Sequence, residues 1–284
     1  MQTGGGAHHD RPAQAGPDGV VHATDQADVT AITPSRRRAP WSRVRRQPGR
    51  PVWLFDLDNT LHHASYAIFP QMNVAMTDFI ERELNLERAQ ADALRSAYTR
   101  RYGAVLIGLM RRHDVDAAAF LEEVHRFEAL PSLVRFERGV RQALLRLPGR
   151  KILFTNAPEQ YALAVLDVIG IRDVFERVVA VEQMRDRRGW RSKPDHGMLR
   201  RTLRQLRATH REAVLVEDTR SHLKHYKRTG LRTVWMVGHL HNARPAVSGG
   251  AGRSVDATGG HAQRRGQSGR PHYIDRRIRS IKSL

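Results

Sequence analysis

Cysteine is absent from the 284 residues, which excludes disulfide scaffolds, thiolate zinc sites and cysteine nucleophiles. Long apolar runs are absent too. No window approaches the ~18 consecutive apolar residues that a membrane-spanning helix needs, and the N-terminal segment has no apolar core of a secretory signal. A chain without cysteine fits a reducing compartment. We therefore expect a soluble, cytoplasmic protein that is not exported and has no membrane partner.

Acidic residues are scarce: 29 Asp and Glu face 48 Lys and Arg, for a net charge of +19. Much of the excess lies in flanks rich in Gly, Ala, Ser and Arg, which bury too little apolar surface to order themselves. The composition predicts a disordered basic N-terminal tail at 1–50 and a flexible Gly/Arg-rich segment at 243–271. This composition favours solvated basic tails, and a weak, nonspecific attraction to nucleic acid is the alternative.

Short apolar runs at 52–55, 152–154, 178–181, 214–216 and 233–237 have the length and composition of buried strands. Segments with helical apolar spacing separate them. Alternating β and α elements predict an α/β fold, a Rossmann-like doubly wound parallel sheet. In such sheets ligands bind at the carboxyl ends of the strands. Three of these runs end in polar residues, namely Asp56, Thr155-Asn156 and Glu217-Asp218.

The interval 62–131 is too long for a loop and has helical apolar spacing throughout. We expect a helical cap inserted after the first strand, which would exclude water and select the substrate. The α/β core then comprises 51–61 and 132–242. Residues 272–284 carry three isoleucines at positions 274, 278 and 281 and predict a short C-terminal element that docks on the core.

The sharpest local pattern is Asp56-Leu57-Asp58, two carboxylates immediately after a buried strand. On an extended backbone both side chains point to one side. Like charges this close oppose each other's ionisation unless a cation or a shared proton is present. Taken alone, the pattern is equally typical of a turn or a helix cap, so its meaning depends on the other polar strand ends.

Four motifs together resemble the haloacid dehalogenase superfamily of phosphohydrolases over residues 51–240. In chain order they are Asp56-Leu57-Asp58-Asn59-Thr60, Phe154-Thr155-Asn156-Ala157, Lys193-Pro194-Asp195 and Val216-Glu217-Asp218-Thr219. The resemblance implies a phosphatase with a Mg²⁺ cofactor and a small phosphomonoester as substrate. It implies that Asp56 attacks phosphorus to form an aspartyl-phosphate, and that Asp58 protonates the leaving oxygen and later activates water.

The resemblance also assigns the remaining site residues. Lys193 is catalytic with Asp56 and Asp58, and it binds phosphate together with Thr155 and Asn156. The implied metal ligands are Asp56, Asp58, Glu217 and Asp218, oxygen donors of the kind that Mg²⁺ takes. One departure from the superfamily pattern is His222, at a place where asparagine is more common.

Three further segments resemble the pyrimidine 5′-nucleotidase group of bacteria and fungi: His62-His63-Ala64-Ser65, Tyr102-Gly103 through Gly108-Leu109, and 120–125. The implied substrates are nucleoside 5′-monophosphates such as UMP and CMP. Two alternatives stay open: a phosphatase of another small metabolite, such as a sugar phosphate or phosphoglycolate, and a non-catalytic basic nucleic-acid-binding protein on a hydrolase fold. Candidate contacts for the leaving group are His62, His63, Tyr66, Tyr102 and His125, although packing alone explains such residues as well.

Overall fold

The structure, a computed structural model, describes residues 20–22, 49–187, 189–240 and 270–284. Nearly all of the predicted basic tail at 1–50 and of the predicted segment at 243–271 lies outside these described residues. The two segments, and the attraction to nucleic acid through them, therefore stay predictions.

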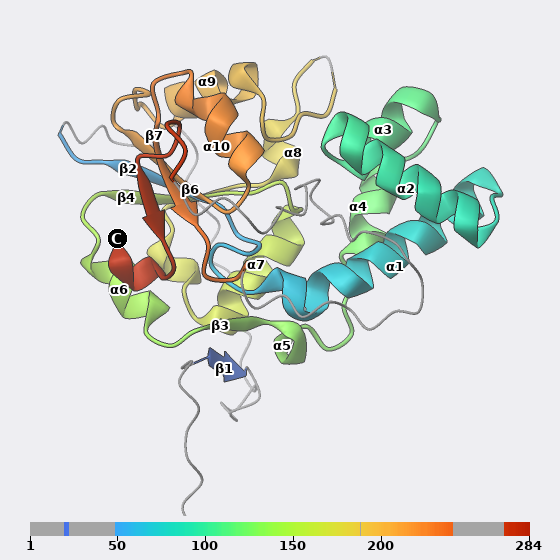
Figure 1. Cartoon of the computed structure of the whole chain (residues 1–284), viewed down its shortest axis with the longest axis horizontal. Helices are drawn as coiled ribbons and strands as arrows, with labels where there is room; N and C mark the ends of the chain where they lie inside the picture. The colour runs from blue at the N-terminus through green and yellow to red at the C-terminus, as the bar shows by residue number, and fades with distance from the viewer. Residues whose placement is uncertain (1–19, 23–48, 188, 241–269) are drawn as a thin grey trace, which may run out of the picture.

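Six strands form one parallel sheet in the order β5-β4-β2-β6-β7-β8 (Figure 1). They are β2 (Val52–Phe55), β4 (Arg150–Phe154), β5 (Arg177–Val179), β6 (Ala213–Glu217), β7 (Arg232–Met236) and β8 (Arg276–Ile278). A separate antiparallel pair joins β1 (Val20–His22) to β3 (Arg135–Glu137). The predicted α/β fold with a doubly wound parallel sheet is confirmed. The predicted strand at 178–181 was too long, because the chain turns into α8 (Val181–Met184) after Val179.

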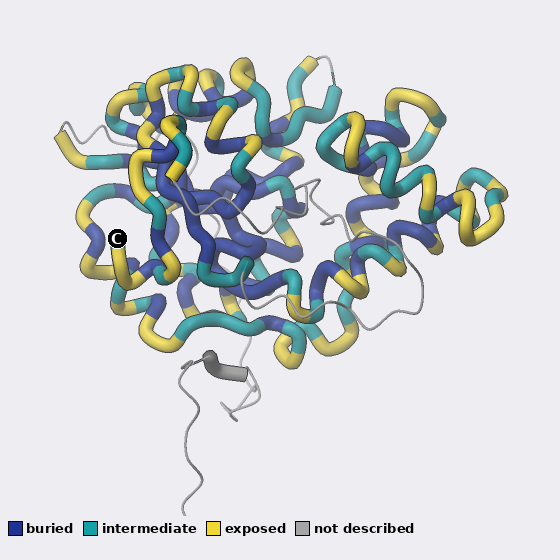
Figure 2. The backbone as a smooth tube through the Cα atoms, in the orientation of Figure 1, coloured by how far each residue is buried: buried dark blue, intermediate teal, exposed yellow. Residues whose placement is uncertain are grey.

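Alternate side chains of each strand enter two different cores. On one face Phe55, Leu153 and Val216 pack with α6 (Val140–Arg146) and α7 (Glu159–Ile169). On the other face Leu54, Phe154 and Leu215 pack with α9 (His196–Gln205) and α10 (Arg220–Lys227). Because both faces are covered, the strands read as nearly continuous apolar runs. Figure 2 shows the sheet as the buried centre of the molecule.

Helices also fill the interval between β2 and β3, where the sequence predicted a helical insert. They are α1 (Ala64–Leu84), α2 (Arg88–Tyr102), α3 (Val105–Arg112), α4 (Ala117–Val124) and α5 (Leu130–Leu133). Short 3-10 turns occur at η2 (Arg172–Val174) and η3 (Ile281–Ser283). Among the residues described, no helix has the length and apolar character needed to cross a membrane. The domain boundaries, and the role of this insert as a cap, stay predictions.

The ends and contacts of the inserted helices follow from local chemistry. Helix α1 ends where Asn85 adopts a left-handed conformation, which asparagine tolerates better than most residues. At the start of α4 the side chain of Asp116 accepts a hydrogen bond from the backbone N–H of Ala118. Gly108 lets α3 approach α2, because a Cβ at this position would lie 2.4 Å from the ring of Tyr98. The helices therefore form a close-packed unit beside the sheet (Figure 1).

A stacked histidine pair connects the start of the insert to the turn after β7. The rings of His63 and His239 lie 5.4 Å apart at an interplanar angle of 20°. Burial, together with the neighbouring histidines, lowers the pKa of His63 to about 4 and that of His239 to about 3. Both rings are therefore neutral at pH 7, and their protonation opposes the folded state.

We predict that acid destabilises the protein through this pair. As the pH falls below the unfolded pKa of about 6.5, His63 and His239 bind protons in the unfolded chain but stay neutral in the folded chain. The free energy of unfolding therefore falls. Each histidine should contribute a loss of about 1–2 kcal/mol between pH 7.5 and pH 5, measured by urea unfolding. The double variant with His63→Phe and His239→Phe keeps two aromatic rings but should lose less stability over this range than the wild-type protein.

The control is His210→Phe, a substitution of the same kind in the turn before β6. It should lose as much stability between the two pH values as the wild-type protein. An equal loss in the double variant and in the control would contradict the role of the stacked pair.

Candidate active site

Three strands deliver polar side chains to the same edge of the sheet. Leu54 of β2 lies opposite Ile152 of β4 and Leu215 of β6, so the three strands end nearly level with one another. The backbone N–H of Asp56 then donates to the carbonyl of Val216 at 3.0 Å. This register brings together Asp56, Thr155 and Glu217, which are far apart in the sequence, and each of them is buried.

A buried lysine connects two of the carboxylates. The Nζ atom of Lys193 lies 2.6 Å from Oδ1 of Asp56 and 2.8 Å from Oε2 of Glu217, and donates a hydrogen bond to each. Lys193 is 3% exposed. A lone ammonium at this depth would be strongly disfavoured, whereas two carboxylate partners compensate its charge. We refer to Asp56, Lys193 and Glu217 as the charged triad.

Hydrogen bonds fix the loop that carries Lys193 at both ends of the motif Lys193-Pro194-Asp195. The side-chain oxygen of Asn156 accepts from the backbone N–H of Lys193 at 2.7 Å, and its Nδ2 donates to the Lys193 carbonyl at 3.2 Å. Two residues later, Oδ1 of Asp195 accepts from the N–H of Met198 and caps α9. The sequence did not suggest this positioning role for Asn156, and its predicted contact with phosphate stays a prediction.

The turn after β2 is shaped by an asparagine. Asn59 has a positive φ of 58°, a conformation that Asn adopts more readily than most residues. Its side chain accepts from the backbone N–H of Ser65 at 3.0 Å and donates to the Ser65 hydroxyl at 2.8 Å. The hydroxyl of Thr60 donates to Oδ2 of Asp56 at 3.3 Å. The turn therefore ties the first motif to the beginning of α1.

Thr155 keeps a proton that it can donate. Its Oγ1 accepts a hydrogen bond from the N–H of Ala157 at 3.1 Å, which leaves the hydroxyl hydrogen available. Its own N–H pairs with the carbonyl of Val179. The predicted role of Thr155 in phosphate binding therefore stays a prediction that its geometry allows.

The pKa values of the two carboxylates in the charged triad are shifted in opposite directions. Burial and the charge of Glu217 raise the pKa of Asp56 to about 7, although Lys193 opposes this rise. Burial alone would also raise the pKa of Glu217, yet Lys193 and His222 hold it well below its usual range. The ring of His222 is buried, with Nδ1 3.3 Å from Oε2 of Glu217. The residue that departs from the superfamily pattern therefore faces this carboxylate.

Asp218 completes an acidic cluster that fits a divalent cation. Within the described part of the chain, Asp56, Glu217 and Asp218 form a group whose ligand atoms lie within 4.8 Å of one another. Hard carboxylate oxygens are the donors that Mg²⁺ prefers. Besides burial, the charge of Glu217 raises the pKa of Asp56, and a cation bound here would offset that repulsion. The carboxylate of Asp58 is not in this group, and its ligand role stays a prediction.

Asp58 instead has two partners that the sequence did not indicate. The Tyr161 hydroxyl donates to Oδ1 of Asp58 at 2.8 Å, and Nε2 of His62 lies 2.9 Å from the same oxygen. Both partners are buried. The sequence did not point to Tyr161, which lies on α7, 103 positions after Asp58.

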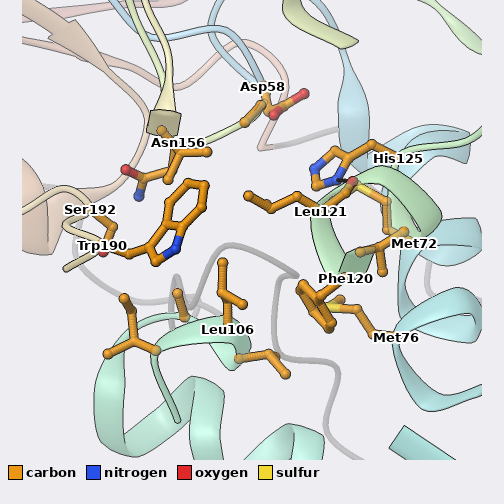
Figure 3. A pocket seen from close by; sticks show the side chains of 16 residues that line it. Asp58, Met72, Met76, Leu106, Phe120, Leu121, His125, Asn156, Trp190 and Ser192 are labelled. Carbon is orange, nitrogen blue, oxygen red and sulfur yellow. Dashed lines mark hydrogen bonds between the residues drawn. The ribbon is translucent and has the colours of Figure 1, made fainter. Parts of the chain in front are cut away.

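A pocket opens beside Asp58, between the core and the inserted helices (Figure 3). Of the candidates for contact with the leaving group, His125 lines this pocket, whereas Tyr66 and Tyr102 do not. Tyr66 is 43% exposed and lies under the guanidinium of Arg135. The hydroxyl of Tyr102 accepts from Nε of Arg112 at 3.0 Å. We refer to the pocket beside Asp58 as the inner pocket.

Comparison with known proteins identifies relatives of both the sequence and the fold. Phosphate metabolism protein 8 of Saccharomyces cerevisiae is 26% identical over 139 residues, which are 46% of this chain and 43% of that protein, so the match spans less than half of the relative. The structure of CbbY from Rhodobacter sphaeroides in complex with phosphate is 18% identical, covers 83% of this chain and 96% of its own, and has a TM-score of 0.52.

A HAD phosphatase from Thermococcus onnurineus is 17% identical, covers 82% of this chain and 95% of its own, and has a TM-score of 0.49. The likeness to CbbY supports the fold described above. The sequence profile of haloacid dehalogenase-like hydrolases matches residues 52–224, a span that contains the charged triad, Asp58 and Asp218. The chain therefore belongs to the haloacid dehalogenase-like hydrolase family.

Proposed function

We propose that this protein is a Mg²⁺-dependent phosphomonoester hydrolase that acts through an aspartyl-phosphate on Asp56, with nucleoside 5′-monophosphates, pyrimidine nucleotides above all, as substrates. The charged triad next to Asp218 supports this proposal most directly. A buried cluster of this composition adds little net stability, because replacing buried ion pairs with apolar groups is often neutral or stabilising. The cluster is instead suited to bind a cation, Mg²⁺, together with the phosphate of the substrate.

The charges of substrate and site determine what the cluster has to do. A phosphomonoester is a dianion at pH 7, and the nucleophile that attacks it is a carboxylate. The Lys193 ammonium, which Asp56 and Glu217 keep charged by raising its pKa, supplies one compensating charge. A bound Mg²⁺, held by Asp56, Glu217 and Asp218, would neutralise further charge on the phosphate and on the carboxylates.

The reaction steps fall to Asp56 and Asp58. One carboxylate oxygen of Asp56 forms a bond to phosphorus while the bond between phosphorus and the leaving oxygen breaks. Asp58 gives its proton to that oxygen, so that a neutral alcohol leaves. The same carboxylate then takes a proton from water, which attacks the aspartyl-phosphate and releases inorganic phosphate. Lys193 and the Thr155 hydroxyl bind the phosphate oxygens during both steps.

Tyr161 and His62 are positioning residues for Asp58 in this proposal. Both direct their hydrogen bonds to Oδ1, which leaves Oδ2 to exchange the proton with the substrate. Burial and the charge of Asp58 raise the pKa of Tyr161 well above its ordinary value, so the phenol keeps its proton and remains a donor. A carboxyl group held in one orientation loses less entropy when it reaches the leaving oxygen.

The inserted helices support the nucleotide part of the proposal. The interval between β2 and β3 carries the three segments that resemble pyrimidine 5′-nucleotidases, and its helices form one wall of the inner pocket, where the leaving group would lie. The absence of cysteine supports a cytoplasmic setting as a further part of the proposal.

We predict that Asp56→Asn lowers kcat for hydrolysis of 4-nitrophenyl phosphate in Mg²⁺ by at least ~10³-fold, because the amide is a far weaker nucleophile. Release of 4-nitrophenol measures the rate, and EDTA should abolish the wild-type activity. Arg204→Gln, on the exposed side of α9, is the control and should keep full activity. Wild-type turnover by Asp56→Asn would refute the mechanism.

We predict that Tyr161→Phe acts selectively on substrates whose leaving oxygen needs a proton. The loss of one hydrogen bond to a charged group should lower kcat/KM for an alkyl phosphate about tenfold, but should change kcat/KM for 4-nitrophenyl phosphate much less. The matched control is Tyr98→Phe, which removes a similar hydrogen bond to His113 at 2.7 Å within the insert. An equal fall on both substrates would show that Tyr161 does not position the acid.

A further inference from the structure

The inner pocket is lined mainly by apolar side chains. Met72, Met76, Leu106, Phe120 and Leu121 contribute from the inserted helices, and Trp190 from the segment between α8 and α9. Asp58 lies at one end of the pocket, and Met76 and Phe120 lie at the other (Figure 3). A group bonded to the phosphate oxygen that Asp58 protonates would therefore extend along apolar surface.

The polar groups of the inner pocket are few and uncharged, apart from Asp58. Besides Asp58 they belong to Asn156, Ser192 and His125. The side chain of Asn156 is already bonded at both ends to the backbone of Lys193. No lysine or arginine is among the described residues that line the pocket.

His125 offers this pocket an acceptor. Its Nδ1 is 2.9 Å from the carbonyl of Leu121 and donates to it, which leaves Nε2 without a proton in the neutral ring. Burial lowers the pKa of His125 to about 4, so the ring is neutral at pH 7. His125 can therefore accept one hydrogen bond from a leaving group but cannot compensate a negative charge.

This lining discriminates between classes of phosphomonoester. A carboxylate or a second phosphate on the leaving group would be buried beside Asp58 without a cation, which is costly. A sugar with several free hydroxyls would lose hydrogen bonds to water and regain few. An aromatic or other apolar ring loses little on entering and gains contact with the indole of Trp190.

We infer that the substrate of this site is a phosphomonoester whose leaving group is uncharged and places an apolar or aromatic ring against Trp190. This inference rests on the proposed function and narrows it. It allows a nucleoside whose base, rather than its ribose, lies against Trp190. It argues against phosphoglycolate and multiply phosphorylated sugars, because their leaving groups carry a negative charge.

Trp190 also limits the size of the leaving group. The inner pocket has a volume of about 70 Å³, and an adjoining cavity of about 370 Å³ shares Leu121, His125 and Trp190 with it. These three side chains therefore form the partition between the two spaces. A leaving group larger than a single ring has to displace the partition or extend past it.

Binding of non-hydrolysable phosphonates tests the inference without requiring turnover. The Kd values of phenylphosphonate and 4-carboxyphenylphosphonate are measured by calorimetry on the full chain in Mg²⁺ at pH 7.5. The two compounds share a ring and a phosphonate and differ in the charge of the distal group. We expect phenylphosphonate to bind at least about tenfold more tightly. Equal binding, or tighter binding of the carboxylated compound, would overturn the inference.

Two pairs of variants locate the preference. Leu106→Lys places a cation in the inner pocket and should reduce or reverse the preference for the neutral ring, whereas Val74→Lys adds the same charge at a 51% exposed position of α1 and should leave it unchanged. Trp190→Ala should weaken phenylphosphonate binding by about tenfold, and Trp190→Phe, which keeps a ring, by much less. If Trp190→Ala binds as tightly as the wild-type protein, the ring does not pack on Trp190.

Turnover measurements separate this inference from the proposed function. The corresponding esters, phenyl phosphate and 4-carboxyphenyl phosphate, should differ in kcat/KM in the same direction as the phosphonates differ in Kd. The carboxyl group withdraws electrons and would if anything speed cleavage, so a slower reaction reflects binding. A neutral-ring preference without any Mg²⁺-dependent hydrolysis would refute the proposed function alone, and hydrolysis without the preference would refute this inference alone.

Discussion

The ion pairs of the buried Lys193 ammonium with Asp56 and Glu217 are the interaction on which the rest of the site depends. The three side chains come from two strand ends and one loop, so their contact holds β2, β6 and the segment before α9 in one arrangement. Removal of one partner would leave a buried charge without compensation, which is costlier than the loss of a surface ion pair. The side-chain bonds of Asn156 and the helix cap of Asp195 keep the lysine in place.

Core and insert contribute different chemistry to the same space. The core supplies charged and hydroxyl groups at the ends of its parallel strands, where a phosphate and a cation can be held. The inserted helices supply apolar side chains such as Met76 and Phe120, which line the far end of the inner pocket. Tyr161 lies between the two parts, because its hydroxyl bonds to Asp58 while its ring lies 5.3 Å from that of His125.

Much of the core could be predicted from the sequence, because buried parallel strands leave continuous apolar runs that end abruptly. The runs at 52–55, 152–154 and 214–216 all lie within strands, and the polar residues that follow them meet at one edge. β8 was not predicted as a strand. Its sequence, Arg276-Arg277-Ile278, is too short and too polar for periodicity to reveal, and its pairing with β7 becomes visible only in the folded chain.

The sequence by itself determined the family, the parallel sheet and the residue types of the first motif, because these depend on local order: an apolar run, a turn and two carboxylates in fixed succession. Only the tertiary structure decided that Tyr161 and His62 share one oxygen of Asp58, that His222 faces Glu217, and that Trp190 closes a pocket with Leu121. Apart from the Asp58–His62 pair, which lies within the turn after β2, these contacts join residues on different elements, and packing in three dimensions selects them. No periodicity or spacing along the chain encodes them.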